Sequence, residues 1–166
     1  MPTMKLGGAL KKAIELEEWG FAFYTESAKK TKDREGKSMF EFLAGEETKH
    51  AERIQKLIEG DTVDEEIEVW VPEIKEIEAT IFKRKVPGGR ADEKADSLEA
   101  LNIGIEAEKN SIELYGKLAE QCDNKKCPKV FHKLVSEEQK HLAILEKEVE
   151  FVTETGSFTD FKVITT

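Results

Sequence analysis

Apolar side chains recur at three- and four-residue intervals in four stretches of the chain, which is the spacing of one face of an α-helix. The first two stretches occupy residues 4–60, with a polar turn at residues 31–36, and the last two occupy residues 97–152, with a polar turn at residues 123–126. Each pair of stretches therefore predicts a helical hairpin, and the fold class is expected to be all-α.

The two predicted hairpins are copies of each other in sequence. A shift of 91 residues places Phe40 on Phe131 and Leu43 on Leu134, and it needs no gap within the repeat. Duplication is the simplest cause of this pattern. It implies a pseudo-two-fold axis that makes equivalent faces of the two hairpins meet.

The segment 61–96, which joins the hairpins, carries a mixed pattern. Residues 67–71 alternate like a strand, residues 74–81 are spaced like a short helix, and the Pro-Gly-Gly run at residues 87–89 breaks what precedes it. A long crossover between the hairpins is expected from this segment. The tail, residues 153–166, is expected to be a frayed end or a small packed strand.

Ionisable residues interrupt the apolar faces at equivalent positions of the two copies. A Glu-x-x-His pair places a carboxylate and an imidazole on neighbouring turns of one helical face. One Glu from each of two helices and one Glu-x-x-His from each of two others form the ligand set of a carboxylate-bridged two-metal site. The predicted ligands are Glu17, Glu47, His50, Glu108, Glu138 and His141.

A glutamate on a helix is ordinarily a solvated surface residue, but these four glutamates lie in register with the apolar positions of their helices. Burying an unpaired carboxylate costs several kcal/mol unless a cation compensates it. Four carboxylates, two divalent ions and two neutral imidazoles are formally neutral together. Such oxygen-rich ligation suits iron or manganese. Iron is preferred because an open, carboxylate-bridged pair can exchange two electrons with bound dioxygen or peroxide, although zinc can occupy such a site in a purified sample.

Two tyrosines follow the single glutamates at the same distance in both copies. Tyr24 and Tyr115 lie seven residues after Glu17 and Glu108, which is two turns along the same face. A phenol at this position is expected to hydrogen-bond a metal-binding carboxylate and so to support the site from outside the ligand set. Packing in the core is the alternative explanation.

Other residues near the ligands have simpler interpretations. Gly20 and Ser111, one turn after the single glutamates, leave room for an ion and an exogenous ligand. Glu46 and Glu137 are duplicated too, but as neighbours of ligands they can simply face outward. His132, the third histidine, is expected on the surface.

Size and composition restrict the class of protein. A chain of 166 residues is expected to be one domain, residues 1–166, and its charged fraction of 37% indicates helices with ion-paired outer faces. A net charge of −9 argues against nucleic acid or an anionic membrane as partner. With no long apolar run and no signal-peptide pattern, a cytoplasmic location is expected.

The two cysteines, Cys122 and Cys127, match neither a redox motif nor a zinc motif. Two free thiols near a helix–helix turn are expected, and a loop disulfide is the alternative.

The chain resembles the diiron domain of the rubrerythrins, in the ferritin-like superfamily, over residues 1–152. The resemblance rests on the run Ala-Ile-x-x-Glu-x₆-Tyr, its copy in the second half, and two Glu-Glu-x-x-His runs. It implies a ferritin-like four-helix bundle made of two duplicated hairpins and a long crossover. It also implies that Glu47 and Glu138 bridge two irons, with Glu17 and His50 on one iron and Glu108 and His141 on the other.

Two departures limit what the resemblance implies. The paired Cys-x-x-Cys motifs of a rubredoxin module are absent, so a separate electron-donor protein such as a rubredoxin is expected. An additional carboxylate ligand of rubrerythrins falls at Ser111 here, so the ligand set is closer to that of ferritin-like oxidases and bacterioferritins.

The leading functional prediction is a non-haem diiron oxidoreductase that reduces hydrogen peroxide, or reacts with dioxygen, using external electrons. Ferroxidase or iron-storage activity is the first alternative, and a helical scaffold with a structural metal site is the second. A homodimer is expected because closed two-fold assemblies dominate homo-oligomers. Domain exchange through the crossover stays open.

Overall fold

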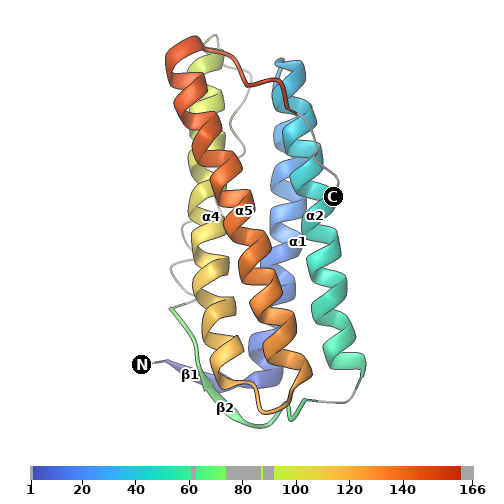
Figure 1. The fold of residues 1–166 in the computed structure, drawn as a ribbon. Coiled ribbons are helices and arrows are strands. Elements are labelled where there is room, and N and C mark those ends of the chain that lie inside the picture. Colours follow the sequence, from blue (N-terminus) through green and yellow to red (C-terminus); the bar gives the residue numbers. More distant parts are fainter. Residues whose placement is uncertain (1, 61–62, 74–86, 88–91, 162–166) are drawn as a thin grey trace.

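The computed structural model describes residues 2–60, 63–73, 87 and 92–161, and it shows the predicted all-α four-helix bundle (Figure 1). The helices are α1 (Leu6–Lys30), α2 (Arg34–Glu59), α4 (Glu93–Gln121) and α5 (Lys126–Thr155). Two short strands, β1 (Thr3–Lys5) and β2 (Glu68–Trp70), lie at one end of the bundle.

The four helices pack as two antiparallel hairpins. The most extensive contacts join α1 to α2 and α4 to α5, and the hairpins meet where α1 faces α4 and α2 faces α5. Figure 1 shows that α2 ends near the strands, whereas α4 begins at the opposite end of the bundle. This arrangement requires a long crossover between the hairpins, as the sequence predicted.

Two helices begin earlier than the apolar pattern indicated, because polar side chains cap them. Asp33 Oδ1 accepts the backbone N–H of Glu35 at 2.9 Å, which fixes the start of α2 and shortens the predicted polar turn. Asp92 Oδ1 accepts the N–H of Ala95 at 3.0 Å, so α4 begins within the segment assigned to the crossover. Apolar periodicity does not detect such caps because their residues are polar.

The strand pattern of the crossover is confirmed by β2, which pairs antiparallel with β1 so that Val69 lies opposite Met4. The apolar pattern placed the start of the first helix at residue 4, but β1 occupies Thr3–Lys5 and α1 begins at Leu6. The side chain of Gln121 fixes this ribbon to the end of α4, because its Nε2 donates to the carbonyl oxygen of Trp70 at 2.6 Å and its Oε1 accepts from the Trp70 N–H at 2.7 Å. The predicted helical spacing at residues 74–81 lies outside the described residues.

The apolar core divides into two clusters along the bundle axis. One cluster, nearer the strands, includes the fully buried Leu10 and Leu134, and the other includes Phe40 and Leu101. The layer between the clusters contains buried acidic and imidazole side chains. Among the described residues, no helix is both long and apolar enough to span a membrane.

The expectation of free thiols is wrong, because Cys122 and Cys127 form a disulfide. The turn between α4 and α5 brings their Cα atoms to 5.8 Å, within the range that a disulfide spans. The side-chain oxygen of Asn124 accepts the N–H of Cys127 at 2.9 Å and so holds this turn. Sequence spacing alone does not reveal how tightly such a turn folds.

The tail folds back onto the bundle between Ser157 and Phe161 and forms no strand there. The N–H of Phe158 donates to Asp33 Oδ2 at 3.2 Å, and the N–H of Thr159 donates to Glu148 Oε2 at 3.1 Å. The Phe158 ring, 5% exposed, packs on Phe40. This part of the tail is therefore packed rather than frayed.

Candidate metal centre

The six side chains that the sequence singled out meet in the polar layer between the two apolar clusters. Each of the four helices contributes to this layer, and no ligand candidate is more than 4% exposed. The contributions are Glu17 from α1, Glu47 and His50 from α2, Glu108 from α4, and Glu138 and His141 from α5.

The ligand atoms fall into two overlapping groups, and within each group they all lie within 4.8 Å of one another. Each group therefore has the size of the coordination sphere of one ion. The first group is Glu17, Glu47, His50 and Glu138, and the second is Glu47, Glu108, Glu138 and His141. Two carboxylates, those of Glu47 and Glu138, are common to both.

Glu138 lies between the two histidines. Its Oε1 is 2.8 Å from Nδ1 of His50, and its Oε2 is 3.3 Å from Nδ1 of His141. Glu17 Oε2 is 3.5 Å from the first Nδ1, and Glu108 Oε1 is 3.9 Å from the second. The same ring nitrogen of each histidine thus faces the carboxylates, which is the symmetry expected of duplicated hairpins.

The hydrogen bonds expected of the two tyrosines are present, and each one joins the two hairpins. The Tyr24 hydroxyl, on α1, donates to Glu108 Oε1 on α4 at 2.7 Å. The Tyr115 hydroxyl, on α4, donates to Glu17 Oε1 on α1. Burial and the neighbouring carboxylates raise the pKa of both tyrosines well above 10, so both phenols keep their protons.

Crowded, buried negative charge changes the proton affinity of the cluster. Burial, and then the charges of Glu17 and Glu138, raise the pKa of Glu47 well above its ordinary value. Burial and the charge of Glu17 raise the pKa of Glu138 to about 7. Burial lowers the pKa of His50, but the hydrogen bond to Glu138 and the adjacent Glu17 carboxylate raise it more strongly, to about 11.

The donor set fits divalent cations. Within the described part of the chain, the buried Glu17 Oε2 has no hydrogen-bond partner, and an unpaired buried carboxylate oxygen is costly without a cation. Two divalent ions would balance the four carboxylates and leave the imidazoles neutral. The residues present therefore suit a pair of ions chemically as well as geometrically.

The space expected beside the carboxylates is also present. A hollow of about 10 Å³, close to the size of one water molecule, is lined by Gly20, Ser111, Glu47 and Glu108. A Cβ atom on Gly20 would lie only 3.2 Å from the Glu47 carboxyl carbon. A small residue is thus needed at this position for the space to remain.

Glu137 has a role that the sequence interpretation missed. Instead of simply facing outward, its Oε2 lies 2.8 Å from Nε2 of His50 and accepts a hydrogen bond from Nη1 of Arg53 at 2.7 Å. Its duplication beside the ligands was the only sequence signal. Glu46, the equivalent residue, is half-buried and pairs with Lys49. His132 is exposed, as expected.

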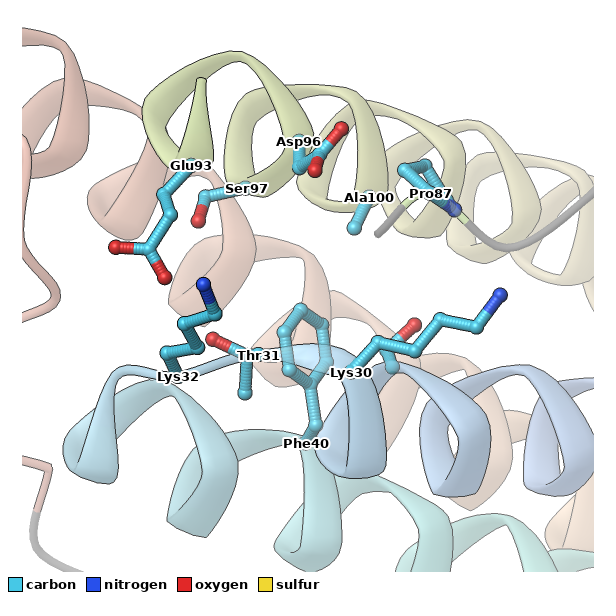
Figure 2. A pocket seen from close by; sticks show the side chains of 10 residues that line it. Lys30, Thr31, Lys32, Phe40, Pro87, Glu93, Asp96, Ser97 and Ala100 are labelled. Atoms are coloured by element: carbon cyan, nitrogen blue, oxygen red, sulfur yellow. The ribbon is translucent and has the colours of Figure 1, made fainter. Parts of the chain in front are cut away.

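Two other hollows differ in their relation to the cluster. A groove of about 540 Å³ is lined by His141, Phe42 and Ile144, and it therefore reaches the ligand cluster. Figure 2 shows a smaller pocket, of about 30 Å³, between the α1–α2 turn and the start of α4, where Lys32 and Glu93 face each other. None of the six ligand candidates lines this second pocket.

Comparisons with known proteins agree with this architecture. The family model described as Rubrerythrin matches residues 8–149. A Thermotoga maritima protein described as ferritin-like and diiron-carboxylate is 29% identical, with a TM-score of 0.71 over 90% of this chain and 97% of that one.

Two further solved structures share the fold at lower identity. A hypothetical protein from Pyrococcus furiosus is 22% identical, with a TM-score of 0.71 over 94% of each chain. The bacterioferritin-related protein from Bacteroides fragilis, described as a dodecameric thioferritin, is 22% identical, with a TM-score of 0.67 over 91% of this chain and 88% of that one. A search of curated proteins gave no match.

Proposed function

We propose that this chain, which belongs to the rubrerythrin family, holds two iron ions between its four helices and reduces hydrogen peroxide with them. The observation that carries the proposal is the shared position of two carboxylates. Glu138 directs one oxygen to each histidine, and Glu47 belongs to both groups of ligand atoms. Carboxylates shared in this way are the means by which helix bundles hold paired ions.

Each of the six ligand candidates then has a specific role. Glu47 and Glu138, which belong to both groups of ligand atoms, would be shared by the two ions, and the remaining four ligands would divide evenly. Glu17 and His50 serve one ion, and Glu108 and His141 serve the other. The ligand atoms are oxygen and imidazole nitrogen only, which favours iron or manganese; zinc remains able to occupy the site in a purified sample.

The chemistry comes from the ions and the positioning comes from the protein. A ferrous pair supplies two electrons, which with two protons convert one peroxide into two waters. Tyr24 and Tyr115 hold two of the carboxylates in place, and the hollow beside Gly20 and Ser111 leaves open space next to the carboxylates of Glu47 and Glu108. A separate electron-donor protein, such as a rubredoxin, returns the electrons. Dioxygen is the alternative oxidant.

The proposal is tested in two steps. Protein purified without added metal is assayed for metal content, and two ions per chain are expected. Protein loaded anaerobically with ferrous iron is then mixed with peroxide and a reduced rubredoxin, and many turnovers per chain are expected. His141→Gln should abolish turnover, whereas His132→Gln, at the exposed histidine, should not. Consumption of one peroxide per iron pair and no more contradicts the proposal.

Ser111 favours a second candidate function. It lies beside Glu47 and Glu108 where the rubrerythrin resemblance implies a further carboxylate, so the cluster has the six ligands of a ferritin-like oxidase. Oxidation of ferrous iron for storage needs a hollow shell of many subunits. The expected homodimer has no such cavity, so measurement of mass in solution separates the two functions. Bound metal without any turnover indicates a structural site instead.

A further inference from the structure

The internal repeat is broken around the two histidines. The 91-residue shift that superposes the ligands also superposes Glu46 on Glu137, but it places Arg53 on Ile144. The guanidinium near one histidine is therefore replaced by a hydrocarbon side chain near the other. The two halves of the cluster differ in how firmly their histidines are held.

The His50 half is held at both ring nitrogens. Nδ1 lies 2.8 Å from Glu138, and Nε2 lies 2.8 Å from Glu137. Glu137 is itself fixed by a 2.7 Å hydrogen bond from Arg53, and the His50 side chain is fully buried. Partners of this kind orient a metal-binding histidine and strengthen its bond to the ion.

The His141 half lacks this support. In the described part of the chain, no hydrogen bond holds Nε2 of His141. Ile144 stands where Arg53 fixes Glu137 in the other half, so it cannot fix Glu46 in the same way. Glu46 forms an ion pair with Lys49 at 3.5 Å, and that lysine side chain is 64% exposed. An exposed pair of this kind contributes little free energy, so the Glu46 carboxylate can move.

His141 also borders the groove of about 540 Å³ that lies between α2, α5 and the packed tail. Phe42 and Ile144 form its apolar part. Four acidic side chains and two lysines line the rest, so the lining attracts a small cation. Glu46 and Glu137 both lie in this lining with His141. Glu137 is held by His50 and Arg53, so Glu46 is the carboxylate that can pass a cation between solvent and the cluster.

We propose that the ion on the His141 side is the exchangeable one, which enters and leaves as a divalent cation through this groove with Glu46 as its first ligand. The ion on the His50 side stays in place. This inference rests on the proposed function, since it requires two bound ions. The two ions of a formally symmetric site are then expected to exchange at different rates, because only His50 is held at both ring nitrogens.

The test follows metal release rather than activity. Full-length protein is loaded with two equivalents of cobalt(II), which has the charge of ferrous iron and visible absorption bands, and is then mixed with excess chelator. Two phases of equal amplitude are expected, with rates that differ by about 10-fold or more. A single phase that releases both ions overturns the inference.

Substitutions at Arg53 and Ile144, the equivalent positions that differ between the halves, show which ion leaves in which phase of cobalt release. Ile144→Arg supplies the missing clamp and should slow the fast phase about 10-fold, while Arg53→Ile should accelerate the slow phase by a similar factor. Glu46→Gln should slow the fast phase alone, and Glu137→Gln, its equivalent in the repeat, should affect the slow phase. Circular dichroism checks that each variant is folded.

The two proposals fail in different ways. Binding of fewer than two cobalt ions per chain contradicts the paired-ion site itself. Two other outcomes leave the paired site intact and refute only the unequal exchange. In the first, two ions bind and leave together. In the second, Ile144→Arg leaves the fast phase unchanged and Arg53→Ile leaves the slow phase unchanged.

Discussion

The metal-free protein should lose stability as the pH rises from about 4.5 to 7. Burial and the charge of Glu17 raise the pKa of Glu138 from 4.5 to about 7, so the folded protein binds this proton more tightly than the unfolded chain does. The resulting stabilisation is complete below the unfolded-state pKa and is lost as the pH rises through the folded-state pKa. The difference between the two pKa values corresponds to a decrease in the free energy of unfolding on the order of 3 kcal/mol between low and high pH.

Neighbouring groups also make the metal-free protein less stable as the pH rises. Burial and nearby carboxylates raise the pKa of Glu47 and Glu108, so their protons also favour the folded state at lower pH. The raised pKa of His50, about 11, extends the loss of stability above pH 6.5. Glu17 and His141 act in the opposite sense because their pKa values are lowered. The contribution of Glu17 changes only below about 4.5, and that of His141, one group against three carboxyls, changes only below about 6.5.

The assay is urea unfolding of chelator-treated protein at several pH values from 5 to 8. Glu138→Gln should remove most of the pH dependence and make the metal-free protein more stable than wild type at pH 7.5, whereas Glu41→Gln, at an exposed position of α2, should match wild type. Saturating divalent metal should reverse the trend, because the ligands must be deprotonated to bind it. A metal-free wild type that becomes more stable between pH 5 and 7 would refute the reasoning.

Three further predictions test the surroundings of the cluster. Tyr24→Phe removes the donor to Glu108 and should weaken metal affinity about 10-fold or more in a competition titration. Gly36→Val places a Cβ 2.7 Å from the Phe158 ring and should lower the free energy of unfolding by about 1–3 kcal/mol and expose the tail to protease, whereas Gly45→Ala, which meets nothing within 4 Å, should not. Replacing both cysteines of the α4–α5 turn by serine should cost about 2 kcal/mol in urea unfolding, and an unchanged midpoint would contradict a stabilising disulfide.

The sequence by itself determined the helical hairpins, their duplication and the six ligand candidates. These features are local or repetitive: apolar spacing identifies the buried face of each helix, and the shift of 91 residues identifies equivalent positions. A glutamate such as Glu47 that lies on an apolar face must be buried when that face packs, whatever the details of packing. The convergence of the six side chains follows from this constraint and from the repeat.

Only the tertiary structure decided the contacts that cross between helices. The bond from Tyr24 to Glu108 joins α1 to α4, and the clamp of Glu137 and Arg53 on His50 joins α5 to α2. Such partners depend on the rotation and the axial position of each helix against its neighbours. A pattern read along one helix contains neither quantity, so the unequal support of the two histidines becomes visible only when the helices are packed.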